Sequence, residues 1–223
     1  MHEDAQRRVR RSPLLSITPI VLLAVLTLVL LWEIVRANVT GEAARQWPWR
    51  LQLMDMNPLG SLLAVAVAGV LARAQYARTV RPALGWRSTW ARGDLEPDER
   101  AWRVGVLNGG QHHAVVERVD YQCVPRGGEP GPWTDHAGLI AELAAARFVF
   151  GKDYRMGTFS PGFPLSGSTG HSTVEAGVFA QRFVDEIDVL LMRVRVTDAV
   201  GDSHERSMDL MRGARVEREG FPD

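Results

Sequence analysis

The chain has little cysteine, little lysine and no excess of charge. Its 223 residues include one cysteine, Cys123, which cannot form an intramolecular disulfide, so nothing indicates an oxidising compartment. Basic and acidic residues are equal in number, 26 of each. This balance argues against a nucleic-acid-binding protein, which normally carries a basic excess on its domain. Lys152 is the only lysine, and this preference for arginine suggests a GC-rich bacterial genome.

Motifs for catalysis or metal binding are also missing from the sequence. No Cys-x-x-Cys or His-x-x-x-His spacing occurs, and the adjacent His112 and His113 would point to opposite faces of a strand. The segment Gly151-Lys152-Asp153 lacks the earlier glycine and the Ser or Thr of a phosphate-binding loop. We therefore expect no catalytic, cofactor or metal site, and a protein that is not an enzyme.

A few residues keep weaker hypotheses of ligand binding open. The segment 167–170, Gly-Ser-Thr-Gly, could offer backbone amides to an anion, and Asp198 and Asp202 could bind calcium, although turn formation explains both. A pocket formed by His112, His136 and Asp153 would indicate an enzyme or a lipid-binding domain. Such a site would combine residues that are distant in the sequence.

The strongest feature that is present is an apolar run over residues 14–35. Roughly 20 apolar residues in a helix are enough to cross a hydrocarbon core of about 30 Å. The run is longer than the apolar part of a signal peptide, and no clean cleavage site follows it, so we expect an uncleaved anchor. Its one ionisable residue, Glu33, is expected to snorkel or to pair with Arg36.

A second apolar run, residues 58–77, predicts a second membrane helix, although a buried or interfacial helix is the alternative. Small residues recur every four positions along it, and such a row lets helices approach closely. We expect this helix-packing row to contact the first helix, or otherwise another protein. The row consists of Gly60, Ala64, Ala68 and Ala72.

The arginines around these runs predict the orientation in the membrane. Residues 1–13 form a basic tail with four arginines, five arginines follow from Arg73 to Arg92, and the connecting loop 36–57 has three. The positive-inside rule then places both termini in the cytoplasm and the loop outside, in a multi-pass protein of the inner membrane. Basic residues after the second run are expected to contact anionic lipid: Arg73, Arg78, Arg81 and Arg87.

The remaining sequence alternates apolar and polar residues, which is typical of half-buried strands. The clearest example is a hairpin in which Leu190, Met192, Val194 and Val196 share one face, followed by a turn at 198–202. We assign residues 78–100 to a linker with a possible first strand, 101–212 to the domain and 213–223 to a tail. This pattern predicts an immunoglobulin-like β-sandwich, mainly β, behind a two-helix transmembrane hairpin.

One or two helices are expected to interrupt the strands. Thr134 or Asp135 can cap a helix with a stripe of leucine and isoleucine, which Gly151 could end. Phenylalanine and isoleucine recur every four residues later in the chain and suggest a second short helix. These residues are Phe179, Phe183 and Ile187.

Several short motifs carry a resemblance to a group of known proteins. They are Arg-Pro-Ala-Leu at 81–84, Asn-Gly-Gly at 108–110 with Ala114 after it, Thr197-Asp198, and Gly201-Asp202. With two N-terminal spans, the chain resembles functionally uncharacterised membrane proteins of actinobacteria that carry a cytoplasmic β-sandwich. At 112–114 this chain has His-His-Ala where those proteins often have Gly-Pro-Ala. The resemblance implies an architecture and no activity.

Three functions remain as hypotheses. The first is a non-enzymatic inner-membrane protein that presents a cytoplasmic β-sandwich to a protein partner or to a second copy. The second is an accessory subunit of a membrane transport, secretion or envelope assembly, which would pack through the small-residue row of the second helix. The third is a ligand- or lipid-binding domain or an enzyme. We expect membrane lipid as a further partner, and neither nucleic acid nor a small-molecule substrate.

Overall fold

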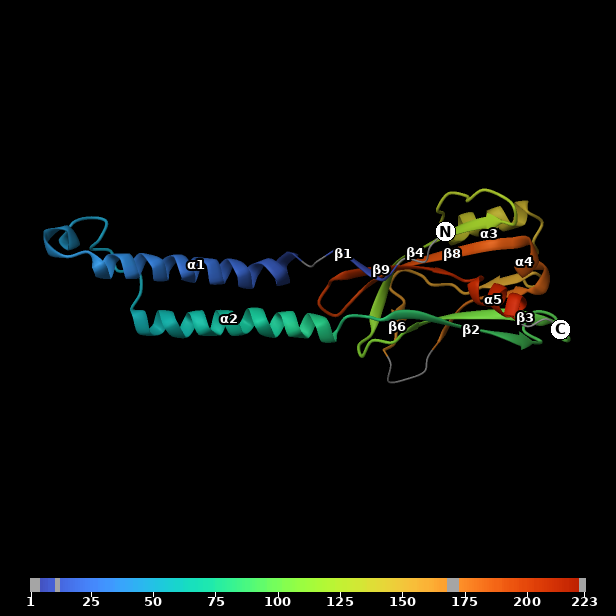
Figure 1. The fold of residues 1–223 in the computed structure, drawn as a ribbon, viewed down its shortest axis with the longest axis horizontal. Coiled ribbons are helices and arrows are strands. Elements are labelled where there is room, and N and C mark those ends of the chain that lie inside the picture. The colour runs from blue at the N-terminus through green and yellow to red at the C-terminus, as the bar shows by residue number, and fades with distance from the viewer. Residues whose placement is uncertain (1–4, 11–12, 168–172, 221–223) are drawn as a thin grey trace. The chain divides into compact units, whose positions relative to one another are not determined.

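A computed structural model describes residues 5–10, 13–167 and 173–220 of the chain. The chain divides into two compact units (Figure 1). One unit is the segment Ser12–Thr79, and the other combines Met1–Arg11 with Val80–Asp223. The N-terminal residues therefore belong to the same unit as the C-terminal half of the chain.

The first unit is a hairpin of two long helices that lie side by side. Helix α1 spans Pro13–Asn38 and α2 spans Met56–Thr79, with a short 3-10 helix, η1, at Gly41–Arg45 between them. By length and composition both helices are able to cross a membrane, and each is a few residues longer than the apolar run that predicted it. Leu26 of α1 belongs to one buried apolar cluster with Leu59 and Ala66 of α2.

The small-residue row of α2 does not contact α1. Gly60, Ala64, Ala68 and Ala72 are exposed in the hairpin, whereas the buried positions of this helix are Leu59 and Ala66. The expectation that this row packs on the first helix is therefore wrong. Leucine side chains give more apolar contact than a row of Cβ atoms, so the face that carries them turns to the partner helix. Contact of the row with another protein stays a prediction.

The second unit consists of two antiparallel sheets packed as a β-sandwich-like domain. Sheet A has the order β1-β9-β8-β4-β6 and sheet B the order β2-β3-β7-β5. The strands of sheet A are β1 Arg7–Arg10, β9 Ser203–Asp209, β8 Ile187–Thr197, β4 Ala114–Pro125 and β6 Pro164–Leu165. Those of sheet B are β2 Leu84–Arg92, β3 Arg100–Asn108, β7 Val174–Ala180 and β5 Tyr154–Met156.

The core lies between the sheets and confirms the alternation in the sequence. Along β8 the even-numbered residues from Leu190 to Val196 are buried in it, and the odd-numbered arginines of the same strand point outward. Trp102 of β3 is 1% exposed, and its Nε1 donates a hydrogen bond to the carbonyl oxygen of Leu210 at 2.9 Å. This bond ties the end of β9 to the opposite sheet.

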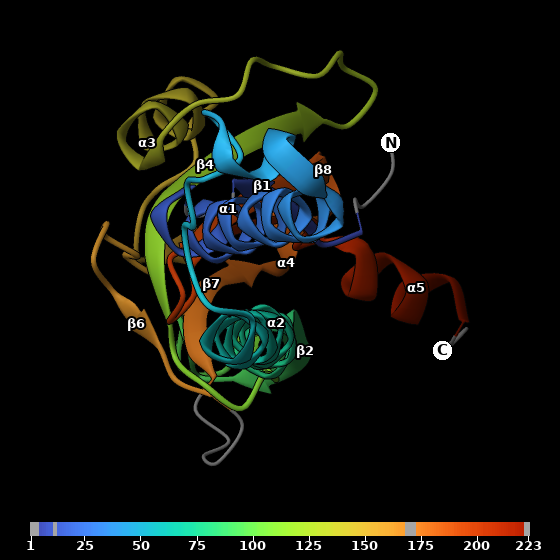
Figure 2. The same ribbon diagram turned by 90° about the vertical axis from the view of Figure 1, so that its left-hand side faces the viewer.

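Among the described residues, three helices accompany the sandwich. Helix α3, His136–Ala145, lies beside β4 (Figure 2), and the side chain of Asp135 caps it by accepting a hydrogen bond from the Gly138 amide at 2.8 Å. The expected cap is thus confirmed, but the helix ends before Ala146 and does not continue to Gly151. The other two are α4, Gln181–Glu186, and α5, Arg212–Gly220.

The expected second helix is only partly correct. Of the three residues that recur every four positions, Phe183 alone lies in α4, whereas Phe179 belongs to β7 and Ile187 to β8. All three side chains are nevertheless in the core. The four-residue spacing correctly predicted that these side chains are buried, but it wrongly predicted one continuous helix. The end of β7, the helix α4 and the start of β8 each place one of the three side chains in the same core.

The domain also begins earlier than the sequence suggested. Residues 7–10, expected within a basic tail, form strand β1, which pairs with β9 at the edge of sheet A. Strand β2 lies inside the segment 78–100 assigned to a linker, and it pairs with β3 over nine residues. Between β5 and β7 the chain forms the short strand β6, and residues 168–172 lie outside the described part of the chain.

Candidate functional site

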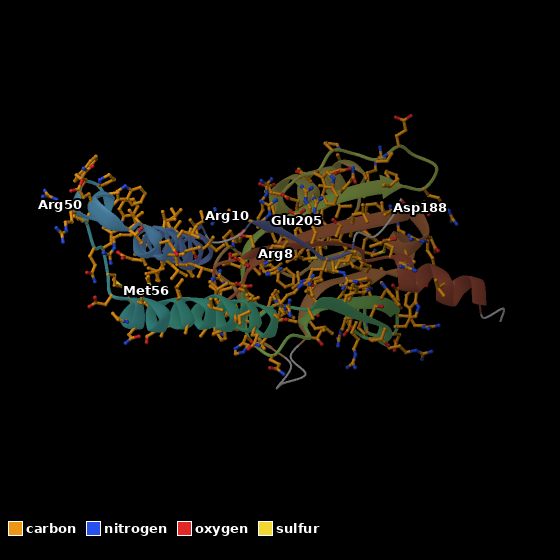
Figure 3. The ribbon with its side chains drawn as sticks, turned by 60° about the vertical axis from the view of Figure 1, so that its left-hand side comes forward. Arg8, Arg10, Arg50, Met56, Asp188 and Glu205 are labelled. Atoms are coloured by element: carbon orange, nitrogen blue, oxygen red, sulfur yellow. The ribbon has the colours of Figure 1, made fainter. Side chains whose placement is uncertain are left out.

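The N-terminal strand β1 is held against β9 by ion pairs as well as by backbone pairing. The Nη2 atom of Arg7 lies 2.8 Å from Oε1 of Glu205, and Nη1 of Arg8 lies 3.1 Å from Oδ2 of Asp202. Both carboxylates are buried, with 4% and 3% of their side chains exposed, whereas 65% of the Arg7 side chain and 41% of the Arg8 side chain are exposed. Figure 3 shows Arg8 and Glu205 close together. The arginines of β1 therefore cover buried carboxylates of β9 and of the turn before it.

Gln6 adds a second attachment just before β1. Its Nε2 donates a hydrogen bond to the carbonyl oxygen of Pro82 at 2.6 Å, and its Oε1 accepts one from the amide of Leu84 at 2.9 Å. Leu84 is the first residue of β2, so this one amide group joins the segment that leads to α1 with the segment that follows α2. The two connections of the hairpin to the sandwich are thereby held to each other.

Further ion pairs lie beside that of Glu205 on the outer surface of sheet A. Arg195 lies opposite both Glu205 and Arg118 in the strand register, and its Nη2 is 2.7 Å from Oε2 of Glu205. Asp120 is likewise held by two arginines, with Arg118 Nε at 2.7 Å and Arg193 Nη2 at 2.9 Å. We call this set of residues the arginine face. It consists of Arg7, Arg118, Arg193, Arg195, Asp120 and Glu205.

Charge on this face does not cancel. Burial raises the pKa of Glu205, but the hydrogen bonds from Arg7 and Arg195 outweigh it and leave that pKa below its ordinary value, so the carboxylate is charged at neutral pH. Four guanidinium groups then surround two carboxylates. At one end of the face Glu117 accepts a hydrogen bond from the Ser203 hydroxyl at 2.9 Å. With Glu117 counted, one positive charge remains in excess.

Asp198 and Asp202, the possible calcium ligands, lie in the turn between β8 and β9 and have partners within the protein. Asp198 accepts hydrogen bonds from the amides of Val200 at 3.0 Å and Asp202 at 2.9 Å, and its other oxygen lies 2.9 Å from Nε2 of His204. Asp202 faces Arg8, as described above. Within the described ranges, no group of three His, Cys, Asp or Glu side chains is arranged to hold a metal ion. Turn formation accounts for Asp198.

The residues of the hypothetical pocket have separate neighbours. Asp153 accepts a hydrogen bond from the Val149 amide at 2.7 Å and pairs with Arg182 at 3.3 Å. The ring of His136 packs edge-on against Tyr121, with ring centroids 6.2 Å apart. The backbone oxygen of His112 accepts a hydrogen bond from Asn108. Of the possible anion-binding segment 167–170, the last three residues lie outside the described chain.

Cys123 is part of the core. Its side chain is in the buried cluster and the residue is 1% exposed. Burial, together with the nearby charge of Glu142, raises the pKa of the thiol to about 12. A thiol in such a setting is protonated at neutral pH and unreactive, because the thiolate is the nucleophile.

In the hairpin unit, Glu33 organises the start of α2. Its carboxylate accepts hydrogen bonds from the amides of Leu53 at 2.7 Å and Met54 at 3.3 Å, and it pairs with Arg36 at 2.7 Å. The expected pairing with Arg36 is confirmed. The two amide contacts were not predictable, because they join residues 20 and 21 positions apart.

Trp32, the neighbour of Glu33 in the sequence, also contacts the segment that connects α1 and α2. Its Nε1 donates a hydrogen bond to the carbonyl oxygen of Leu51 at 3.1 Å, and its ring stacks on Trp49 at 5.4 Å with an interplanar angle of 8°. Figure 3 places Arg50, in this connection, at the same end of the hairpin as Met56. The end of α1 and the connecting segment thus form one ordered cap.

The four arginines expected to contact lipid lie in the stretch from the C-terminal half of α2 to strand β2. Arg73 and Arg78 lie in the last turns of α2, Arg81 lies between α2 and β2, and Arg87 lies in β2. Arg78, Arg81 and Arg87 are exposed and Arg73 is half-buried. Sequence reasoning missed Gln6, Arg7 and Arg8, which contain no apolar periodicity that would have indicated a strand.

A scan against protein-family models and searches among curated proteins and solved structures found no match to this chain. Any function must therefore be inferred from the geometry described above. Its main elements are the hairpin with its ordered cap, the attachment of β1, and the arginine face of sheet A.

Proposed function

We propose that this chain is a non-enzymatic integral membrane protein whose two apolar helices cross the bilayer and whose sandwich binds another protein in the cytoplasm. Large apolar side chains along both helices support the membrane assignment. Leu28 of α1 is 66% exposed and Val65 of α2 is 69% exposed, with many similar neighbours. Soluble proteins rarely expose continuous apolar surface of this extent, and hydrocarbon is the solvent that it fits.

The observation that carries the proposal is the pairing of β1 with β9. Only Arg11 and Ser12 separate β1 from α1, and four residues separate α2 from β2, so both ends of the hairpin continue into one domain. A chain that crosses the bilayer twice returns to the side from which it started. It can therefore pair a strand made before the crossings with strands made after them. Cleavage after α1 would separate β1 from the domain, which supports an uncleaved anchor.

The cytoplasmic side is supported by the order of synthesis. Arg7 and Arg8 count toward the positive flank, yet in the folded domain they face buried carboxylates of β9 and of the turn before it. These partners lie near the C-terminus and are made after the helices. During insertion the C-terminal strand has not yet been made, so the positive-inside rule applies to the N-terminal arginines.

The strand order supports an immunoglobulin-like sandwich. The order β2-β3-β7-β5 corresponds to strands A-B-E-D of that fold, and β9-β8-β4 corresponds to G-F-C. Strands β1 and β6 are additions at the two edges of sheet A. This agrees with the resemblance to actinobacterial membrane proteins, which we retain as part of the proposal. Fold alone does not assign a function.

The chemistry of the described residues favours binding over catalysis. The thiol of Cys123 is buried, Asp198 holds the β8–β9 turn and contacts His204, and Asp153 accepts a hydrogen bond from a backbone amide. What the domain offers to solvent is a pre-arranged set of guanidinium groups. This favours a protein-interaction domain.

Cysteine labelling tests the orientation on which the proposal depends. In a Cys123→Ala background, Gln46→Cys places a thiol in the exposed connection of the hairpin and Glu129→Cys places one in an exposed loop of the sandwich. A membrane-impermeant maleimide added to intact cells should label the first variant only, and permeabilised cells should show both labelled. Labelling of Glu129→Cys in intact cells would contradict the cytoplasmic assignment.

Cross-linking mass spectrometry of the full-length protein, purified from native membranes in mild detergent, tests the interaction. We expect a protein partner cross-linked to residues of the sandwich. Recovery of the protein with cross-links confined to the helices would contradict it.

An accessory subunit that packs through α2 is the alternative, and the exposure of the small-residue row favours it. Replacing Ala64 and Ala68 with leucine should release a membrane partner that binds there, because the added atoms prevent close approach of a second helix. Val65→Leu, on a neighbouring exposed position, is the matched control. Retention of every co-purified protein in the double variant would exclude this alternative.

A further inference from the structure

We propose that the arginine face of sheet A is the docking surface for an acidic segment of a partner protein. This inference rests on the proposed function and names the kind of partner that the sandwich would bind. The face is formed by side chains from four strands that the register places next to one another: β1, β9, β8 and β4.

The first argument is the position of Arg118 opposite Arg195. Like charges directly opposite each other on neighbouring strands are destabilising. In this sheet each of the two guanidinium groups is turned to its own carboxylate, Arg118 to Asp120 and Arg195 to Glu205. Asp120 and Glu205 each have a second arginine as well. The carboxylates are thus shared, and an anion from outside would complete the pairing.

The second argument is accessibility. Arg118 and Arg7 keep 66% and 65% of their side chains exposed, at opposite ends of a row across the sheet. The carboxylates beneath them are almost fully buried and cannot themselves be reached by a partner. A partner approaching this surface therefore meets guanidinium groups.

The third argument is preorganisation, and it favours protein over lipid. Ion pairs fix the guanidinium planes, and Arg193 also lies over the ring of Trp133, 4.2 Å from its centroid. Fixed guanidinium planes suit bidentate carboxylate recognition and lose little entropy on binding. An anionic membrane surface instead responds to the net charge and not to the orientation of individual guanidinium planes. The face has an excess of one charge when Glu117 is counted.

The spacing of the row indicates the sequence pattern of the partner. Neighbouring strands lie about 4.8 Å apart, so Arg7 and Arg118, three strand intervals apart, are separated by about 14 Å at the backbone. An extended segment advances about 3.3 Å per residue, so carboxylates four positions apart span about 13 Å and lie on the same side. We therefore expect Asp or Glu at positions i and i+4 of an extended segment.

Fluorescence anisotropy with full-length protein in nanodiscs of neutral lipid tests this inference. The probe is a fluorescein-labelled peptide, Gly-Ser-Glu-Thr-Val-Thr-Glu-Ser-Gly, and the same peptide with both glutamates replaced by glutamine is its control. Arg118→Glu should weaken binding of the acidic peptide about tenfold or more. Arg118→Lys should be intermediate, because it keeps the charge and loses the planar fork.

The matched control is Arg92→Glu, an exposed arginine at the end of β2, which should change the affinity less than about twofold. Thermal unfolding should confirm that the Arg118 variants fold, since Asp120 keeps Arg193. If Arg118→Glu misfolds, Arg118→Gln provides the comparison.

Equal binding by wild type and Arg118→Glu, or equal binding of the glutamine peptide, would overturn the inference. So would the absence of peptide binding together with Arg118-dependent binding to vesicles of phosphatidylglycerol, which would make the face a lipid site. Labelling of Gln46→Cys and Glu129→Cys is independent of these results. The inference can therefore fail while the proposed membrane topology stands.

Discussion

Arg7 and Glu205, 198 positions apart in the chain, form an ion pair across the β1–β9 ladder. Both helices of the hairpin lie between these two residues in the sequence. The sandwich therefore includes chain from both sides of the hairpin, and its sheet A is complete only after the C-terminal strand has been made. The N-terminal segment is a structural part of the domain.

The attachment of β1 should depend on Gln6. Replacing Gln6 with alanine removes its two hydrogen bonds, to Pro82 and from Leu84, each contributing about 1 kcal/mol, so β1 should detach roughly thirtyfold more often. Because β1 contains Arg7, Arg8 and Arg10, trypsin should remove the N-terminus correspondingly faster in the variant. Mass spectrometry follows this loss. The exposed Gln111→Ala variant is the control, and equal cleavage rates in both would show that Gln6 does not hold the strand.

Glu205 should make stability depend on pH in the acid range. Its pKa is lowered in the folded protein by Arg7 and Arg195, against the effect of burial, so its contribution is fully present above the ordinary carboxyl pKa of 4.5. That contribution is lost as the pH falls through the lower pKa of the folded state. Glu205→Gln should cost about 2 kcal/mol at pH 7, and the difference from wild type should shrink toward pH 3. Urea unfolding at several pH values measures this, and a difference that is constant with pH would contradict it.

Glu33 should stabilise the connection between the two helices. Glu33→Ala leaves the amides of Leu53 and Met54 and the side chain of Arg36 without this acceptor, so we expect a loss of about 2 kcal/mol. Hydrogen exchange of residues 39–55 in detergent should become faster. Glu42→Ala, an exposed acid in the same connection, should leave the exchange rate unchanged. Similar exchange in both variants would mean that the cap does not depend on this carboxylate.

Cys123 should be unreactive in the folded protein. With the thiol buried and its pKa raised to about 12, N-ethylmaleimide at pH 8 should modify it only after denaturation. The Gln46→Cys variant, with its exposed thiol, should react within the same time and serves as the positive control. Rapid modification of native Cys123 would indicate that the core opens at this position.

Much of the domain could be predicted because its strands follow a period of two. The alternation from Leu190 to Val196 specifies a half-buried strand, and Asp198 with Gly201 specifies the turn after it. Asp135 before a leucine stripe specified the start of α3. These signals are local, since each depends on a few neighbouring residues and on which of their faces is apolar.

Strand β1 could not be predicted in the same way. The sequence Arg-Arg-Val-Arg has one apolar residue, and it forms a strand because β9 presents an unpaired edge with Glu205 nearby and Asp202 just before it. The stabilising partners are far away in the sequence. The arginine face could not be predicted for the same reason. In the sequence, its charged residues are ordinary polar positions of separate strands.

The sequence by itself determined two apolar helices and a set of alternating strands, because apolar length and periodicity depend only on neighbouring residues. The tertiary structure decided which faces and edges meet. It turned Leu59 and Ala66 of α2 toward α1 and left Gly60 and Ala64 exposed, and it placed Arg7 beside Glu205. Contacts of this kind depend on complementary shape and charge between distant segments, and no local pattern contains that information.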